Sequence, residues 1–246
     1  MASVAGDSEA LLAERIEREL VVGLLGGHDR FDPYRREVEA SGLVDHLQSC
    51  YERFWGRVER SSGYNTGRLG DEEGIRIYAL VRELKPEILV ETGVCNGFSA
   101  AFVLLALQQN GAGELHSLDL PEVIGESYEP GTFWEGKRGA AVLPGEKPGW
   151  VIPDQLRSRW QLVLGRSQDE LPPLLERVGA IDFFLHDSEH SYECMTFEFA
   201  TAWHALRERG VLIADDWNWN DAFTELARET GRTPVTLGEK LALLQK

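Results

Sequence analysis

Cysteine is scarce in this 246-residue sequence, and no long apolar run occurs. The three cysteines form no CxxC pair and their number is odd, which argues against a disulfide framework and favours a reducing compartment. The longest apolar stretches, such as residues 100–107, are far shorter than the roughly 20 residues of a membrane-spanning helix. The N-terminal segment lacks the basic and apolar regions of a secretory signal. We therefore expect a cytoplasmic protein without a membrane partner.

Positive charge is scarce as well. The chain has 25 Lys and Arg against 41 Asp and Glu, for a formal net charge of −16, and only five of the basic residues are lysine. Nucleic acids and anionic lipids are bound mainly through clusters of basic residues, so neither class of partner is expected. A solubility surface, an arginine-biased genome and adaptation to high salt remain open as reasons for the acid excess.

What the chain does contain is enough apolar surface for a packed core. Hydrophobic residues make up 43% of the sequence, which excludes a disordered chain. The first third has helical patterns: Ser8 can cap a helix that ends at the glycine pair 26–27, and Asp32 with Pro33 is typical of a helix start. A third helix is expected over residues 71–84.

After residue 86, strand patterns alternate with helix patterns, which predicts parallel βαβ units. The expected strands are residues 87–91, 115–120, 160–165, 181–186 and 210–214, and the expected helices are 97–109, 169–178, 190–207 and 221–230.

The fold class that follows is α/β, with a doubly wound, Rossmann-like, mostly parallel sheet. Residues 234–244, around Gly238 and Glu239, predict a C-terminal antiparallel hairpin. We assign residues 1–70 to an N-terminal helical extension and 71–246 to the main domain, with a Gly/Pro-rich insertion at 121–153. Ligands of such sheets bind at the carboxyl ends of the strands.

The first two strands end in residues suited to a nucleoside. Gly93 and Gly97 allow a tight turn and close approach of a ligand to the backbone, before a helix N-terminus. The turn is not GxGxxG, which disfavours a dinucleotide, and an ordinary βα turn is the alternative. Asp119 follows the second strand, 119 − 97 = 22 residues after Gly97, an interval at which a carboxylate can accept both ribose hydroxyls. A solvated strand-end carboxylate is the alternative.

After the third strand, Ser167 and Gln168 have the polar atoms needed to bind the edge of an adenine ring. Ser167 can equally cap the next helix, with Glu170 completing a capping box, and both roles can hold together.

The fourth and fifth strands end in acids, which meet at one edge of the sheet. Asp187, Asp215 and Asp216 form an oxygen-rich set suited to Mg²⁺ or a similar hard cation, unless some of them only cap helices. His190 is expected on the opening turn of the next helix, facing the same cleft as Asp187, where a neutral imidazole can accept a proton. A histidine simply bonded to a neighbouring acid is the alternative, and His186 is expected to point into the sheet.

In this order and on these strand ends, the motifs resemble those of class I S-adenosylmethionine-dependent methyltransferases. The closest resemblance is to the metal-dependent small-molecule O-methyltransferases, which include catechol enzymes and bacterial sugar O-methyltransferases. It covers about residues 71–246 and rests on Glu91-Thr-Gly-Val-Cys-Asn-Gly-Phe-Ser-Ala, Asp119, Gly165-Arg-Ser-Gln-Asp and the three aspartates.

This resemblance implies a role for each motif. Glu91 would hold the amino group of the methionine part of S-adenosylmethionine, Ser99 would lie near its carboxylate, and Asp119 would bind the ribose. Ser167 and Gln168 would contact the adenine. The three aspartates would ligate Mg²⁺, and His190 would be the catalytic base.

Three features depart from the catechol enzymes. His190 stands where those enzymes have a catalytic lysine, and Asp216 where they have an amide. The insertion at 121–153 is aromatic and rich in Gly and Pro, which suits a substrate lid or a structural excursion.

The expected function is methylation of a small-molecule hydroxyl on a sugar, polyphenol or natural product, with Mg²⁺. A metal-independent N- or O-methyltransferase and a nucleoside-cofactor-binding protein without this activity are the alternatives. The N-terminal helices, with Leu24, Leu25, Phe54 and Trp55, are expected to cover the site or to form a homodimer.

Overall fold

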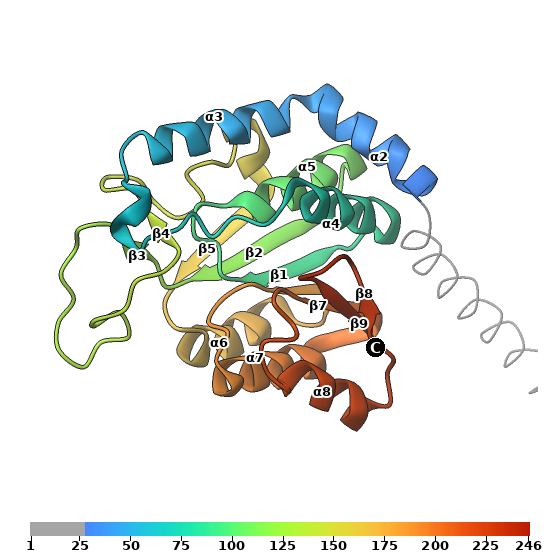
Figure 1. Ribbon diagram of the computed structural model, residues 1–246. Helices are drawn as coiled ribbons and strands as arrows, with labels where there is room; N and C mark the ends of the chain where they lie inside the picture. Colours follow the sequence, from blue (N-terminus) through green and yellow to red (C-terminus); the bar gives the residue numbers. More distant parts are fainter. Residues whose placement is uncertain (1–27) are drawn as a thin grey trace, which may run out of the picture.

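The computed structural model describes residues 28–246, so the helix predicted after Ser8 and the glycine pair at 26–27 lie outside the described residues. A seven-stranded sheet forms the middle layer, in the order β5-β2-β1-β6-β7-β9-β8 (Figure 1). The strands are β1 (Ile88–Thr92), β2 (Glu114–Asp119), β5 (Trp160–Leu164), β6 (Ile181–His186), β7 (Leu206–Ala214), β8 (Val235–Thr236) and β9 (Ala242–Gln245).

The pairing of these strands confirms the predicted sheet. Strand β1 pairs in parallel with β2 and β6, β2 with β5, and β6 with β7. Strand β9 runs antiparallel to both β7 and β8. All carboxyl ends of the parallel strands therefore meet at one edge of the sheet.

Helices cover both faces of the sheet (Figure 1). The helices on one side are α2 (His28–Ser41), α3 (Leu43–Trp55), α4 (Asp71–Leu84) and α5 (Phe98–Asn110), and those on the other are α6 (Ser167–Val178), α7 (Tyr192–Ala205) and α8 (Ala222–Thr230). Two large apolar clusters correspond to these two faces.

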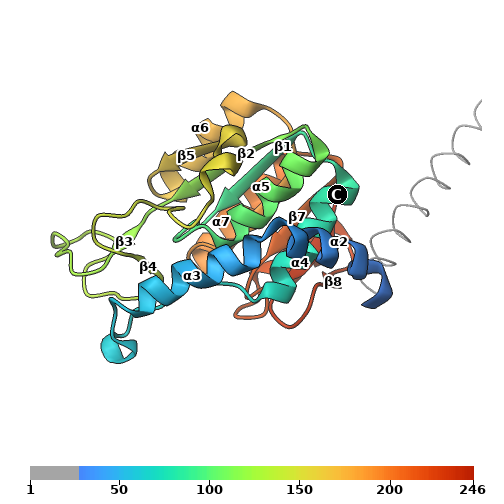
Figure 2. The ribbon, with the colours of Figure 1, turned by 90° about the horizontal axis from the view of Figure 1, so that it is seen from above.

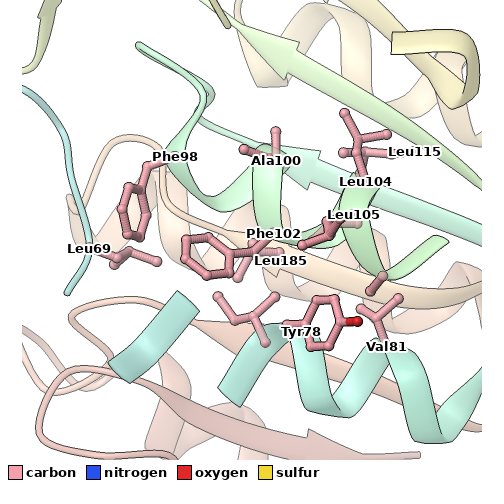
Figure 3. Close-up of a cluster of buried hydrophobic side chains, with 14 of the residues drawn as sticks. Leu69, Tyr78, Val81, Phe98, Ala100, Phe102, Leu104, Leu105, Leu115 and Leu185 are labelled. Atoms are coloured by element: carbon pink, nitrogen blue, oxygen red, sulfur yellow. The ribbon is translucent and has the colours of Figure 1, made fainter. Parts of the chain in front are cut away.

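Helix α5 is central to the first cluster. Every residue from Phe98 to Leu107 is buried, because the helix is enclosed by the sheet, α4 and the N-terminal helices. Figure 3 shows Tyr78 and Val81 of α4 facing the α5 side chains that include Phe102. A methyl group at Gly74 of α4 would lie 2.6 Å from the Phe102 ring, so glycine lets the two helices pack closely.

The N-terminal helices differ in detail from the prediction. Helix α2 begins at His28 and contains Pro33, so the expected helix start at Asp32 and Pro33 is wrong. Because Pro33 lies near the start of the helix, its missing N–H removes a single hydrogen bond, to the carbonyl of residue 29. Helix α3 contributes Leu47 to the same apolar cluster as α5, so the core extends across residue 70. The domain boundary at that residue stays a prediction.

The segment 121–153 leaves the sheet and returns to it. Its strands β3 (Glu122–Val123) and β4 (Ala141–Val142) form a small parallel sheet, and the chain between them loops away from the body of the protein (Figures 1 and 2). Asn96 anchors the returning end: its side-chain NH₂ donates to the carbonyls of Thr66 at 2.8 Å and Ala141 at 3.0 Å. Phe54, one of the residues expected to cover the site or to form a dimer, is fully buried in a small apolar cluster with Leu143.

Two short 3₁₀ helices complete the described chain, at Arg60–Ser62 and Asp154–Arg159. Within residues 28–246, no helix combines the length and the apolar character that crossing a bilayer requires.

Candidate active site

A cavity of about 660 Å³ opens at the edge of the sheet where the parallel strands end. Its walls also include residues 65–69, before α4, and part of the segment 121–153. Eight predicted site residues line it: Gly93, Asp119, Ser167, Gln168, Asp187, His190, Asp215 and Asp216. Three others, Glu91, Gly97 and Ser99, are not among its lining residues. Most of the site residues predicted from the sequence thus line one cavity.

Gly93 and Gly97 let the turn after β1 pack directly against the backbone of other segments. Gly93 has φ +86°, and a methyl group there would lie 1.8 Å from the carbonyl oxygen of Asp187. The end of β1 and the loop after β6 are therefore in direct backbone contact, which only glycine permits. Gly97, at φ +99°, precedes α5, and a methyl group there would lie 2.7 Å from the Cα of Gly149.

Among the described residues, one carboxylate oxygen of Asp119 has hydrogen-bond partners and the other has none. Its Oδ1 accepts hydrogen bonds from the backbone N–H groups of Val94, at 3.0 Å, and Cys95, at 3.3 Å. Its Oδ2 is buried and has no hydrogen-bond partner among the described residues. Burial raises the pKa of Asp119 to about 6, against the effect of the two N–H donors. A ligand with hydroxyl groups would satisfy Oδ2, so the geometry fits the ribose of a nucleoside.

Glu91, near the carboxyl end of β1, is fully buried and does not line the cavity. Ser99 donates its hydroxyl to one carboxylate oxygen, and Ser117 donates to the other at 2.7 Å. Trp160 donates its indole N–H to the Ser117 hydroxyl at 2.9 Å. Burial raises the pKa of Glu91 to about 7, although the two serines oppose the shift. Both oxygens of Glu91 thus have partners within the protein.

Ser167 is the first residue of α6 and does not cap it. The cap position is Arg166, and no side chain bonds to the free N–H groups there, so the capping-box alternative is wrong. The Glu170 side chain instead lies over Gly165, where a methyl group would be 2.5 Å from its Cγ. Ser167 and Gln168 both line the cavity, and the buried Ser167 hydroxyl lies 3.7 Å from Cys194 Sγ.

The acids at the ends of β6 and β7 form the most charged part of the cavity. Asp187, His190 and Asp215 each have a ligand atom within 4.8 Å of those of the other two. Asp216 lines the cavity beside them but does not belong to this group. Burial, and then the charge of Asp215, raise the pKa of Asp187 well above its ordinary value, and burial followed by the charge of Asp216 raises that of Asp215 to about 6.

Two atoms of this group have no hydrogen-bond partner among residues 28–246: Oδ1 of Asp215 and Nε2 of His190. Two crowded carboxylates with an unsatisfied oxygen suit a divalent cation, which would relieve their repulsion.

His190 lies in the loop before α7. Its predicted place on the first helical turn is wrong, because the Ser191 hydroxyl caps the helix by accepting the Cys194 N–H at 3.2 Å. The imidazole Nε2 is 3.8 Å from Oδ2 of Asp215. The ring packs between His186 and Trp219, at centroid distances of 5.2 and 5.0 Å. Burial, and then the neighbouring His186, lower the pKa of His190 to about 4, so the ring is neutral at pH 7.

Sequence reasoning missed three residues near this site. Lys240, in the loop between β8 and β9, and Trp219, which is 66% exposed, both line the cavity. Glu198 lies fully buried on α7. Glu198 could have been found from the sequence as an acid between apolar residues on a buried helix. Trp219 could have been found from its position just after β7. No pattern marks Lys240.

Comparison with known proteins agrees with this architecture. A family model described as a methyltransferase domain matches residues 90–217, more than half of the chain. Among curated proteins, none matches this sequence.

Several solved structures share the fold at low sequence identity. The O-methyltransferase NovP is 17% identical, with 84% of this chain and 98% of that chain covered and a TM-score of 0.58. The O-methyltransferase from Bacillus cereus, solved with SAH, is 16% identical, with 84% and 91% covered and a TM-score of 0.55. The O-methyltransferase TomG from Streptomyces achromogenes, involved in tomaymycin synthesis and solved with SAM, is 16% identical, with 83% and 88% covered and a TM-score of 0.52.

Proposed function

This chain belongs to the methyltransferase domain family, and from that premise we propose that it transfers a methyl group from S-adenosylmethionine to a hydroxyl oxygen of a small molecule. The proposal draws on the fold neighbours, which include O-methyltransferases solved with SAM or SAH. The observation that carries it is the unpartnered Oδ2 of Asp119 beside the cavity, while its Oδ1 is held by the N–H groups of the turn after β1.

In this proposal, Asp119 binds the ribose hydroxyls, and Ser167 and Gln168 contact the adenine. S-adenosylmethionine would supply the electrophilic methyl group. Glu91 and Ser99 hold the two ends of the turn between β1 and α5 together, since their side chains are bonded to each other and neither lines the cavity.

Asp119→Asn is expected to weaken S-adenosylmethionine binding about tenfold to a hundredfold, because an amide replaces a charged acceptor worth about 1.5–3 kcal/mol. Because the pKa of Asp119 is raised to about 6, only the wild-type affinity should fall as the pH is lowered through 6. Calorimetry from pH 5 to 8 measures both effects. Glu114→Gln, at the exposed other end of β2, is the matched control. A variant that binds as tightly as the wild type would remove Asp119 from the cofactor site.

We further propose that Asp187, Asp215 and Asp216 hold Mg²⁺ or a similar divalent cation. A cation in this position would lower the pKa of an acceptor hydroxyl and orient it. Because Mg²⁺ prefers oxygen ligands, the carboxylates are assigned to it and the imidazole is left for proton transfer. The neutral Nε2 of His190, which lacks a partner among the described residues, accepts the hydroxyl proton.

A second candidate is a metal-independent transfer in which His190 and Asp215 act as a pair. The distance of 3.8 Å between Nε2 of His190 and Oδ2 of Asp215 favours it, since a carboxylate near an imidazole stabilises the protonated ring. Chelation separates the two candidates.

Removal of divalent cations with EDTA is expected to reduce methyl transfer at least about a hundredfold, and added Mg²⁺ should restore it. The assay follows S-adenosylhomocysteine formation on a panel of sugar, polyphenol and natural-product acceptors. S-adenosylmethionine binding, measured on the same samples, serves as the control and should persist. Full turnover in EDTA would favour the metal-independent candidate.

The acceptor is proposed to enter between Trp219 and the 121–153 segment, whose Phe133 and Trp134 line the cavity. Aromatic walls favour polyphenols and the apolar faces of sugars. We propose that the loop of this segment acts as a lid over the acceptor.

A further inference from the structure

Glu198 lies in the middle of α7 and is fully buried beside the proposed cation site. Its Oε2 accepts hydrogen bonds from Thr92 Oγ1 at 2.5 Å and from His186 Nδ1 at 2.7 Å. Its Oε1 accepts from Ser188 Oγ at 2.7 Å and from Cys194 Sγ at 3.5 Å. One carboxylate therefore joins the ends of β1 and β6, the loop after β6 and the first turn of α7.

The protonation state of Glu198 decides which atom donates in each of these four hydrogen bonds. Burial alone would raise its pKa, but the charge of His186 and the hydrogen bonds it receives outweigh burial and lower the pKa below its ordinary value. An ionised carboxylate only accepts hydrogen bonds, so His186 carries its proton on Nδ1. Both oxygens are then satisfied by the protein, as a buried charge requires.

The partners of Glu198 flank Asp187 on both sides. His186 precedes Asp187 and Ser188 follows it, and each donates to a different oxygen of Glu198. The Asp187 N–H donates to the carbonyl of Thr92 at 2.8 Å, and the Thr92 hydroxyl is bound by the same carboxylate. The residues on either side of Asp187 are therefore tied directly to Glu198, whereas the backbone bond between Asp187 and Thr92 does not use the Thr92 hydroxyl.

We propose that Glu198 is a positioning residue that holds Asp187 in the arrangement that binds the divalent cation, with His190 kept beside it through the following loop. This inference rests on the cation site of the proposed function. Groups that hold metal ligands in place typically contribute tenfold to a hundredfold in metal affinity.

The two oxygens of Glu198 allow a test that separates positioning from general packing. Ser188→Ala removes the bond to the loop that carries Asp187, whereas Thr92→Val removes a bond of the same kind to the end of β1. Ser188→Thr keeps the hydroxyl and serves as the conservative rescue. Glu198→Gln removes the charge and turns one acceptor into a donor, so it should disturb all four bonds.

The measurement is binding of Mn²⁺ to the full chain, followed by its electron paramagnetic resonance signal, with S-adenosylmethionine affinity and thermal unfolding measured in parallel. We expect about tenfold weaker Mn²⁺ binding for Ser188→Ala and up to about a hundredfold for Glu198→Gln. Ser188→Thr and Thr92→Val should keep an Mn²⁺ affinity within about threefold of the wild type. Thr92→Val should lower the free energy of unfolding about as much as Ser188→Ala, because each removes one buried hydrogen bond.

Three outcomes would count against the inference. If the wild type binds S-adenosylmethionine but no Mn²⁺, the cation part of the proposed function fails, and the positioning role with it. If the wild type binds Mn²⁺ and Ser188→Ala binds it equally well, the proposed function stands and the positioning role is overturned, even if Glu198→Gln does not fold. If Thr92→Val weakens Mn²⁺ binding as much as Ser188→Ala, Glu198 acts through general packing.

Discussion

Replacing Gly93 with alanine is expected to eliminate detectable binding of S-adenosylmethionine and to lower the free energy of unfolding by several kcal/mol. The new methyl group would lie 1.8 Å from the Asp187 carbonyl oxygen, so the end of β1 and the loop after β6 must separate. Both surfaces belong to the cavity, one on the cofactor side and the other on the cation side. A single methyl group should therefore disrupt both halves of the site.

Calorimetry with S-adenosylmethionine and thermal unfolding measure this result. Gly111→Ala is the matched control, because Gly111 also has a positive φ, of +71°, but has nothing within 4 Å of the added methyl group. Gly111→Ala should lower the free energy of unfolding by only about 1–2 kcal/mol, which is the cost of a side chain at positive φ. It should keep full cofactor binding. Normal binding by Gly93→Ala would mean that the contact between the turn and the Asp187 loop is not essential.

The second large effect is expected for His190→Ala, which should reduce kcat about a hundredfold or more, as for the loss of a general base. The neutral imidazole beside Asp187 and Asp215 is the proton acceptor of the proposed reaction. Because its pKa is lowered to about 4, His190 stays neutral as the pH falls from 7 to 5. Loss of activity near pH 6 should therefore follow the carboxylates and not His190. Loss through Asp119 should appear in KM for S-adenosylmethionine, and loss through Asp215, whose pKa is also raised to about 6, should appear as weaker Mg²⁺ binding.

Turnover and Mn²⁺ affinity of the same variant distinguish a base from a ligand. A base lowers kcat and leaves Mn²⁺ affinity within about threefold, since its loss costs proton transfer and not a metal bond. His204→Ala, in the last turn of α7 and outside the cavity lining, is the control and should keep full activity. Loss of Mn²⁺ binding would identify His190 as a ligand, and unchanged kcat would remove it from the mechanism.

The fold was largely predictable because its signals are local. Strand β6 was expected over residues 181–186 and occupies Ile181–His186, since a strand buried on both faces appears as a short apolar run. Helix α4 likewise matches its expected range, 71–84. The order of these elements predicted a parallel sheet, and the edge of that sheet predicted where a ligand binds.

The details of the site were less predictable because they depend on contacts between distant residues. Whether Glu91 faces a ligand or is covered depends on Ser99 and Ser117, 8 and 26 positions further along the chain. The place of His190 depends on which residue caps α7. Glu198 shows no role in the sequence until folding brings Thr92, 106 positions earlier, to its carboxylate.

The sequence by itself therefore determined the sheet, its helices, the edge that carries the site and most of the residues around the cavity. Local propensity and hydrophobic period contain that information, because each element depends on its own neighbours. Only the tertiary structure decided which polar atoms are already paired and which remain free for a ligand. That pairing depends on distances between chain segments, and a single unpartnered oxygen, such as Oδ2 of Asp119, becomes visible only when every neighbour is in place.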